Sequence, residues 1–379
     1  MKQKDIYDYD IIVVGGGVSG CEASYTSASH GARTLLLSIS MDSIGYMPFS
    51  NIISNEKGIS AVGKTIWDGL IFTETAKNNL LDINEKICGE RSKPARKMII
   101  DRKRQMMDIK RTVEIQEDLL IRQGLVTDLE FKDNIYNITT SDGTSYKSRT
   151  VIIACGTFLD SYIFWGDHSF SAGRPGEITS KRLFINLMKS GIKFEKAVIY
   201  GGPKIDGRIQ GMKNTREIKK VYYAVDMGES SIKYMKNSIL DKENSKHREY
   251  GNYKKMNLPI EEIISRFNEK EEYKIYIVPE GKDTVEMYID GFNTAEDEET
   301  QLSVLRKIEG LKNTIITRPG YGTSYNILSP LQINKSLESK NFPGLFFSGK
   351  INGAACSEDS AAQGYIAGLN AFRRINNIN

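Results

Sequence analysis

The stretch VVGGGVSGCEAS, residues 13–24, constrains the fold most strongly, because it places a glycine-rich turn between a strand and a helix. The run DIIVV at 10–14 predicts a short buried strand, and CEASYTSASHG predicts a helix that ends at Gly31. The apolar segment TLLLSI at 34–39 predicts the next strand. Together these segments predict a βαβ unit, which is the building block of a doubly wound parallel sheet.

The glycines of this turn fit the pattern GxGxxG in its proper context, directly after a strand and at the start of a helix. Residues without side chains let the backbone turn tightly and approach a pyrophosphate at the helix N-terminus. We therefore predict a dinucleotide site, and the alternative is a tight turn that binds no ligand. The predicted contacts in this turn are Gly15, Gly16, Gly17, Val18, Ser19 and Gly20.

Both ends of the chain bear on the identity of the nucleotide. An NAD site often has a ribose-binding carboxylate after the second strand, but here LLLSIS offers only hydroxyl groups, such as that of Ser38. Near the other end, LFFSGKINGAACSEDS leads into a helix with Glu358 and Asp359 in its first turn and many small residues after them. The positive end of such a helix stabilises negative charge on a reduced flavin, although an ordinary docking helix is the alternative. Taken with the first motif, this helix favours FAD.

The remaining segments predict the domain organisation. Residues 101–123 predict a long amphipathic helix, and VIIACGTFL at 151–159 predicts a strand that is buried on both faces. A lysine-rich tract and then YKIYIVPEGKDTVEMYIDG, which predicts an antiparallel hairpin, follow later in the chain. We predict an α/β protein with a discontinuous FAD-binding domain, residues 1–199 and 313–379. An inserted α+β domain at 200–312 is predicted to serve the substrate or NAD(P)H.

Composition narrows the classes of partner. With 52 Lys and Arg against 48 Asp and Glu, the net charge of +4 is too small to indicate a nucleic-acid or membrane partner by itself. The chain starts with polar residues, and no apolar run approaches the roughly 20 residues of a membrane span, so we expect a cytoplasmic protein without a signal peptide. Its four cysteines are widely scattered and predict free thiols, and its three histidines lie too far apart to suggest a metal site.

Several longer segments carry a resemblance to a known family, among them RSKPARKMIIDRKRQ, GTFLDSYIFWGDHSFSAGRPGE, RPGYGTSYN, LESKNFPGLFFSGKINGA and SAAQGYIAGLNA. The chain resembles the tRNA uridine 5-carboxymethylaminomethyl modification enzymes of the MnmG (GidA) family and, more distantly, the folate-dependent tRNA uracil methyltransferases. The resemblance implies a glutathione-reductase-like FAD-binding Rossmann fold, a flavin reduced by NADH or NADPH, and a homodimer. It also implies a second protein that takes part in modifying C5 of a tRNA wobble uridine. By position, it implies further FAD contacts at Val126, Gly156, Gly349, Lys350, Asn352 and Gly353.

Two departures from this family concern its functional cysteines. Where the resemblance implies a cysteine after the second strand, GYMPFSNII has Phe49, and where it implies a second cysteine, YKKMNLPIEEIISRF has Asn257. Neither side chain forms a thiolate or adds to a uracil ring. Cys21, Cys155 and Cys356 are candidates to replace them, the alternative being small buried thiols. The chain also ends where members of the family continue into a helical region that engages tRNA and the partner.

Two groups of basic residues are candidate contacts for RNA phosphates. One lies in a basic segment between 91 and 111, for which a solvated helix face is the alternative because aromatic residues for base stacking are absent. The other lies in loops where the resemblance implies that substrate approaches. The predicted substrate-binding residues are Arg91, Lys93, Arg96, Arg174, Lys204 and Arg208.

Three hypotheses about function remain open at this point. The first is an FAD-dependent oxidoreductase that uses NAD(P)H and acts on a substrate other than the standard wobble-uridine intermediate. The second is a shortened tRNA or rRNA uridine-modifying enzyme that obtains its RNA-binding surface from another chain. The third is a flavin-holding scaffold without catalytic activity. The sequence does not identify a catalytic residue for any of them.

Overall fold

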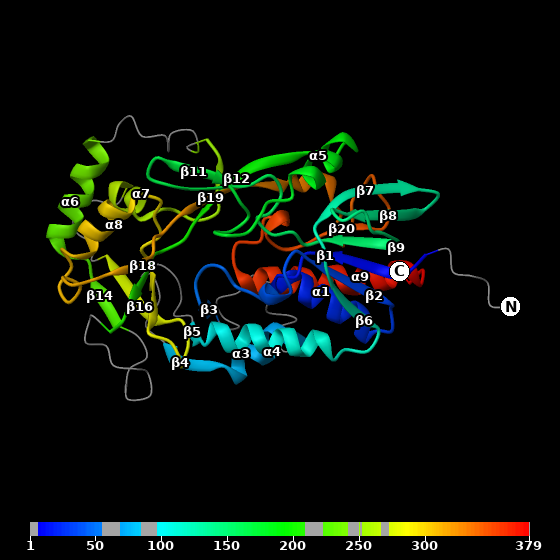
Figure 1. The fold of residues 1–379 in the computed structure, drawn as a ribbon, viewed down its shortest axis with the longest axis horizontal. Helices are drawn as coiled ribbons and strands as arrows, with labels where there is room; N and C mark the ends of the chain where they lie inside the picture. The colour runs from blue at the N-terminus through cyan, green and yellow to red at the C-terminus, as the bar shows by residue number, and fades with distance from the viewer. Residues whose placement is uncertain are drawn as a thin grey trace.

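A computed structural model describes residues 7–54, 69–84, 97–208, 223–241, 250, 252–266 and 273–378. Three of the predicted substrate contacts, Arg91, Lys93 and Arg96, lie outside these ranges. No helix within the ranges is long and apolar enough to cross a membrane. Figure 1 shows an elongated molecule in which the N-terminal strands and the C-terminal helix lie together at one end.

The predicted βαβ unit is present and belongs to a seven-stranded sheet. Its parallel part has the order β6-β2-β1-β9-β20, and an antiparallel meander of β7 and β8 continues from β9. One edge of the long strand β9 pairs with β8 in its first half and with β20 in its second half. The strands are β1 (Tyr9–Val14), β2 (Thr34–Ser38), β6 (Leu119–Gln123), β7 (Val126–Lys132), β8 (Ile135–Thr140), β9 (Ser145–Ile153) and β20 (Leu345–Phe347).

Alternate residues of these strands enter two separate cores, because side chains along a strand point to opposite faces. In β1, Ile11 and Val13 pack under helices α1 (Val18–Ser29) and α9 (Ser357–Ile375), while Ile12 and Val14 pack on the other face. The second face is covered by the β7–β8 meander and helix α5, and α3 and α4 add to the first. These helices are α3 (Ile71–Asn78), α4 (Arg102–Glu114) and α5 (Lys181–Lys189). A parallel sheet covered on both faces is the predicted α/β Rossmann architecture, which is confirmed.

The predicted helix over 101–123 is only partly correct. Helix α4 ends at Glu114, and after a turn with a positive φ of 61° at Asp118 the chain enters β6 as an edge strand beside β2. The apolar residues of both segments fit a helical period when they are read as one run. The structure separates them because the second segment pairs with β2 as a strand of the sheet. Leu119 and Ile121 then pack against the core on one face of that sheet.

The other described residues form three further sheets. The first has the order β11-β10-β19-β12-β15, the second β14-β16-β17-β13-β18, and the third β3-β5-β4. The predicted hairpin is confirmed as the antiparallel pair β16 and β17, next to helices α6, α7 and α8 at the left of Figure 1. The strands of the first sheet are β10 (Tyr162–Trp165), β11 (His168–Ser171), β12 (Phe194–Tyr200), β15 (Lys254–Lys255) and β19 (Gly322–Leu328). The other elements are β3 (Ile52–Ser54), β4 (Leu80–Asn84), β5 (Lys97–Ile100), β13 (Lys204–Asp206), β14 (Tyr223–Asp226), α6 (Gly228–Asp241), α7 (Ile260–Arg266), β16 (Lys274–Pro279), β17 (Glu286–Asp290), α8 (Glu298–Leu305) and β18 (Ile316–Arg318), with short 3-10 turns η1 (Met41–Ser43), η5 (Pro330–Gln332) and η6 (Gly349–Asn352).

The predicted domain boundaries at 199/200 and 312/313 stay a prediction. The sheet β11-β10-β19-β12-β15 draws strands from all three predicted segments, since β12 ends at Tyr200, β15 lies at 254–255 and β19 begins at Gly322. This sheet therefore joins the ends of the chain to its middle.

Helices α1 and α9 pack closely enough that glycine is required between them. A Cβ atom on Gly364 would lie 2.2 Å from the Ser19 carbonyl oxygen, and one on Gly368 would lie 2.5 Å from that of Ala23. Backbone atoms cannot move aside as a flexible side chain can. The small residues of α9 thus set the distance between the two helices.

We predict that Gly364→Ala destabilises the folded protein by about 1–3 kcal/mol, because the added methyl group forces the two helices apart. Urea unfolding of the purified variant measures this change. Gly69→Ala is the matched control, because a Cβ at Gly69 meets no atom of the described residues within 4 Å. Equal stability of the two variants would contradict the close packing of α1 and α9.

Candidate functional site

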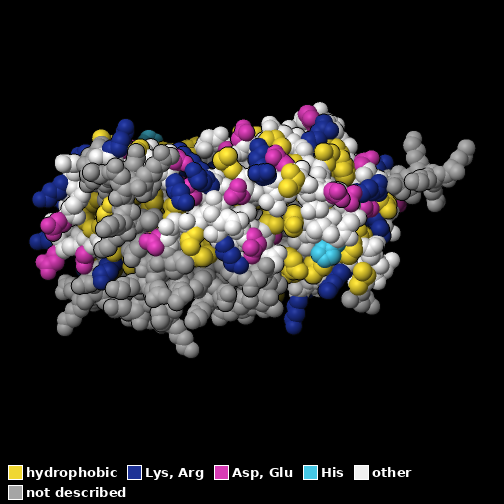
Figure 2. Space-filling view, turned by 90° about the horizontal axis from the view of Figure 1, so that it is seen from below, with side chains coloured by type: hydrophobic (Ala, Val, Ile, Leu, Met, Phe, Trp, Pro, Cys, Tyr) yellow, Lys and Arg dark blue, Asp and Glu magenta, His cyan; other side chains and the backbone are white. Residues whose placement is uncertain are grey.

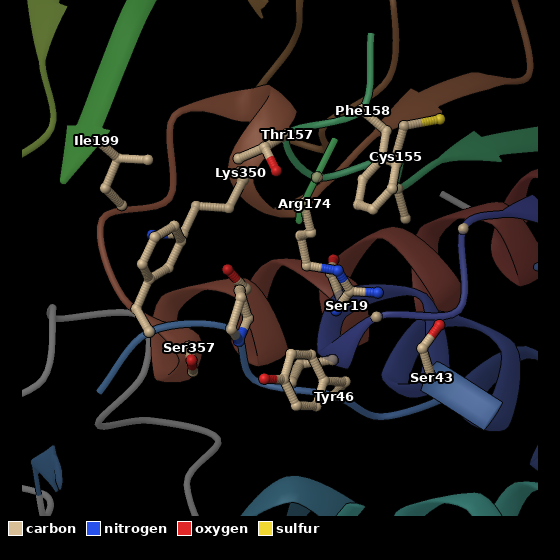
Figure 3. Close-up of a pocket in the computed structure, with 18 of the residues that line it drawn as sticks. Ser19, Ser43, Tyr46, Cys155, Thr157, Phe158, Arg174, Ile199, Lys350 and Ser357 are labelled. Atoms are coloured by element: carbon tan, nitrogen blue, oxygen red, sulfur yellow. The ribbon is translucent and has the colours of Figure 1, made fainter. Parts of the chain in front are cut away.

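A cavity of about 290 Å³ opens at the carboxyl ends of β1, β2 and β9, where ligands bind in doubly wound sheets. Its wall includes the turn after β1, the residues after β2, the loop after β9 and the start of α9. Figure 3 shows side chains from these separate segments directed into the same space. Of the predicted cofactor contacts, the ones that line the cavity are Gly15, Gly16, Gly17, Val18, Ser19, Ser38, Val126, Gly156 and Lys350.

The glycine turn presents backbone rather than side chains to this cavity. Gly15 has a φ of 115°, and a Cβ there would lie 2.4 Å from the Ala154 carbonyl oxygen. A Cβ on Gly20 would lie 1.7 Å from the carbonyl oxygen of Gly15, so Gly20 serves the packing of helix on strand and does not line the cavity. Gly17 and Gly156 differ, because a Cβ on either would meet no described atom within 4 Å. At these two positions the chain leaves open space beside the backbone.

The N-terminus of α1 is suited to an anion. Gly17 is the N-cap of the helix and supplies no side-chain oxygen to the first backbone N–H groups, and the first turn contains no acidic residue. The positive end of the helix dipole and its backbone donors therefore face the cavity without a side-chain cap. Such an end binds phosphate groups readily.

The end of the cavity near β2 is lined by small and apolar residues. Ser38 is the last residue of β2, and its hydroxyl donates a hydrogen bond of 2.9 Å to the Ser40 carbonyl. Gly124, directly after β6, and Val126, the first residue of β7, complete this part of the wall. The oxygen of Ser38 retains the ability to accept a hydrogen bond from a ligand hydroxyl.

A second helix N-terminus reaches the cavity from the other end of the chain. Cys356 is the N-cap of α9 and accepts the Asp359 N–H at 3.4 Å, and Glu358 lines the cavity. Lys350, from the preceding turn, also lines it and donates to the Ala355 carbonyl at 2.5 Å. Burial lowers the pKa of the Lys350 ammonium to about 8, although the neighbouring Cys356, Glu358 and Asp359 act in the opposite direction.

The other predicted cofactor contacts near Lys350 stabilise the turn that carries it and do not line the cavity. Gln363 accepts hydrogen bonds from the Gly349 N–H at 2.9 Å and from the Asn352 side chain at 3.1 Å. Gly353 ends the short helix η6 with a φ of 74°. Gly349, Asn352 and Gly353 are not in the cavity wall, and they hold Lys350 in place.

The two positions at which the resemblance implied cysteines both line the cavity. Phe49 packs against the apolar cluster that β12 and β19 form, and its ring centroid lies 5.8 Å from the Lys350 ammonium. The Asn257 side chain bonds the backbone of Tyr200 twice, donating to its carbonyl at 2.7 Å and accepting its N–H at 2.8 Å. An apolar ring and an amide bonded to the backbone through both its oxygen and its nitrogen therefore occupy these positions.

The candidate replacement thiols are held in their neutral form. Burial raises the pKa of both Cys21 and Cys155 to about 12, and Glu22 adds to the effect at Cys21. Burial and the neighbouring Glu358 also raise the pKa of Cys356. Cys155 and Cys356 line the cavity, whereas Cys21 does not. Since the thiolate is the reactive form, the local environment favours unreactive thiols.

The predicted substrate contacts among the described residues have three different surroundings. Arg174 lines the cavity, where its guanidinium carbon lies 4.7 Å from the Tyr46 ring centroid and its Nη2 pairs with Glu177 at 2.7 Å. Lys204 is buried, with its ammonium 3.1 Å from Glu280. Arg208 is exposed and pairs with Asp206. On the face shown in Figure 2, basic and acidic side chains are interspersed rather than gathered by charge.

The structure adds wall residues that the sequence did not single out. Tyr46, Phe158, Tyr200 and Tyr288 all line the cavity, and they come from four different segments. Tyr46 follows the strand β2 in GYMP, and Phe158 follows β9 in GTFL, so loops at the carboxyl ends of strands were the available signal. No sequence pattern indicated Tyr288 on β17, because its approach depends on the folding of a distant hairpin.

Comparison with known proteins agrees with this architecture. The family model described as glucose inhibited division protein A, GIDA, matches residues 10–379. The chain belongs to the GidA family. The curated MnmG of Bacillus licheniformis, a tRNA uridine 5-carboxymethylaminomethyl modification enzyme, is 31% identical over 97% of this chain and 62% of its own length. The MnmG of Synechocystis sp. is also 31% identical, over 96% of this chain and 61% of its own length.

The solved structures that resemble this chain include a member of the same family, and they share its fold. The structure of Aquifex aeolicus GidA is 25% identical, with a TM-score of 0.85 over 99% of this chain and 64% of that chain. NikD, an amino acid oxidase, is 11% identical with a TM-score of 0.50, and this likeness concerns the fold alone. The chain therefore has the FAD-binding Rossmann fold that the sequence predicted, and it spans 62% of the length of the Bacillus licheniformis relative.

We predict that Cys21 and Cys155 resist alkylation by iodoacetamide at neutral pH in the folded protein, and that Cys356 reacts slowly, because their raised pKa values keep the thiolate fraction small. Mass spectrometry of peptides after timed alkylation measures each site. Protein unfolded in urea is the control, in which all three thiols react freely. Rapid alkylation of Cys356 in the folded protein would instead identify a reactive thiol in the cavity wall.

Proposed function

We propose that this chain binds FAD in the cavity and acts as an FAD-dependent oxidoreductase of the GidA family, with NADH or NADPH as the reductant. The observation that carries the proposal is the entry of two helix N-termini, those of α1 and α9, into one cavity. A dinucleotide with a central pyrophosphate and a flavin at one end matches that arrangement. A bound flavin supplies hydride-transfer chemistry that no protein side chain offers.

The residues present fit this cofactor. The open spaces beside Gly17 and Gly156 and the uncapped first turn of α1 suit a pyrophosphate. Ser38 and Val126, which line the cavity near the end of β2, suit the adenosine half of FAD. Lys350 and the positive end of α9 suit the flavin half, where they favour added negative charge.

We further propose that the substrate is not the standard wobble-uridine intermediate of the family. Phe49 and Asn257 line the cavity where thiols are implied by the resemblance, and neither forms a covalent bond to a uracil ring. The raised pKa values of Cys155 and Cys356 weaken the case for a substitute nucleophile. The chemistry that these residues favour is therefore hydride transfer to a substrate that binds without covalent attachment.

The first test is the visible absorbance of the purified protein, followed by anaerobic NADH or NADPH. We expect bound FAD, either as isolated or after reconstitution, and bleaching of its visible bands by the nicotinamide. Protein that remains colourless and takes up no FAD contradicts the proposed cofactor. Bound flavin that stays oxidised would instead favour a flavin-holding scaffold.

A second candidate function is modification of a tRNA or rRNA uridine by a shortened enzyme. It is favoured by the names of the relatives above, which are tRNA uridine modification enzymes. In that case a second, different chain supplies the RNA-binding surface. The protein itself forms a homodimer, and this homodimer binds that partner.

Modified nucleosides from strains with and without the gene test this second candidate. If it is correct, we expect loss of one modified uridine from tRNA or rRNA, restored by the wild-type gene on a plasmid. A gene copy with Gly15→Asp serves as the control, because it fills the turn that the cofactor needs. An unchanged nucleoside profile would remove RNA modification from consideration.

A further inference from the structure

Behind the cavity, charged side chains form an alternating series that runs from the interior to the surface. Arg102 Nη2 lies 3.0 Å from Glu280 Oε1, and Glu280 Oε2 lies 3.1 Å from Lys204 Nζ. Lys204 Nζ lies 3.9 Å from Glu286 Oε2, and Glu286 Oε1 lies 2.9 Å from Arg318 Nε. The side chains of Arg102 and Glu280 are only 1% and 2% exposed, whereas that of Arg318 is 63% exposed.

The buried ion pair of Arg102 and Glu280 adds little net stability, because taking both charges out of water is unfavourable. Removing two charges from water costs several kcal/mol for each ion, and apolar residues of similar volume often stabilise a fold as well or better. The position of Arg102 therefore points to a role other than stability.

Arg102 contacts the backs of two cavity walls. Its Nη1 donates to the Met47 carbonyl at 3.0 Å, and its guanidinium carbon lies 5.6 Å from the Tyr288 ring centroid. Burial lowers the pKa of this guanidinium, but Glu280, Tyr46 and Tyr288 outweigh that effect and raise the pKa above its ordinary value. Tyr46 and Tyr288 line the cavity, and Arg102 does not.

These two tyrosines belong to different parts of the fold. Tyr46 follows β2 and η1 of the Rossmann sheet, and its ring also faces Arg174 at 4.7 Å within the cavity (Figure 3). Tyr288 lies on β17 of a separate sheet, and its hydroxyl accepts the Gly202 N–H at 3.1 Å. Arg102, on α4, thus contacts both walls, alongside Asn51, whose side chain donates to the Pro279 carbonyl at 2.7 Å.

We propose that Arg102 is a positioning residue that holds Tyr46 and Tyr288 at the spacing that the bound dinucleotide requires. This inference rests on the proposed FAD site. The ion pair with Glu280 fixes the guanidinium relative to the hairpin of β16 and β17, and the bond to Met47 fixes it relative to the loop after β2. Loss of Arg102 removes one of the contacts that set the spacing of the two walls, and affinity for FAD falls even where the protein stays folded.

Stability and positioning can be separated by comparing one single and one double variant. Arg102→Met leaves Glu280 without its guanidinium partner, so we expect lower resistance to urea and weaker FAD binding by about tenfold or more. Arg102→Met/Glu280→Met removes both charges and leaves Lys204 paired with Glu286. We expect this double variant to regain resistance to urea while its dissociation constant for FAD stays about tenfold above that of the wild type.

The measurements are urea unfolding without FAD and titration of the full chain with FAD, together with the visible circular dichroism of the bound flavin. Arg104→Gln is the matched control, because Arg104 also lies on α4 and pairs with Asp283 of the same hairpin at the surface. We expect it to change affinity by no more than about twofold. If the double variant does not fold, Arg102→Lys keeps the buried positive charge but lacks the geometry to bridge the two walls, so weakened FAD binding is again expected.

Wild-type affinity for FAD in the double variant, or in Arg102→Lys, would overturn the inference and leave the proposed function intact. Wild-type protein that takes up no FAD would overturn both. Weakened binding with an altered dichroism spectrum in variants that remain folded supports the positioning role.

Discussion

The structure depends on how closely helices α1 and α9 approach each other. Ser19 and Ala23 on α1 present backbone carbonyls to Gly364 and Gly368 on α9, and no larger residue fits between them. The two helices also begin on the same side of the sheet, since each follows the carboxyl end of a parallel strand. Their N-termini consequently meet at one cavity. A site suited to negative charge is thus created by two segments more than 300 residues apart along the chain, as the hydrogen bond between Ser19 and Ser348 illustrates.

Most of this fold was predictable from local pattern. The parallel strands β1, β2 and β20 are mainly apolar and buried on both faces, and the glycines of the first turn are needed for backbone reasons that a sequence reveals directly. The end of α4 was not predictable in the same way. Leu119 and Ile121 continue a helical period, and only their pairing beside β2 selects a strand.

The cavity was predictable only in part, for a related reason. Contacts from Gly15, Ser38 and Lys350 follow from motifs near strand ends, and these residues do line the cavity. Tyr288 lies in the same wall because the β16–β17 hairpin packs there, and although local pattern predicts the hairpin, it does not encode that packing. Lys204 belonged by sequence to a basic group, but ion pairing with Glu280 places it in the interior. Charge in a sequence indicates a surface only when no partner is buried with it.

The cavity between the start of α1 and the start of α9 is the proposed FAD site. A crystal structure of the protein with FAD would locate the cofactor. We expect the pyrophosphate at the backbone of Gly17 and Val18, with the flavin ring between Phe49, Lys350 and the first turn of α9. FAD bound elsewhere, or a cavity closed by its own side chains at saturating FAD, would contradict it.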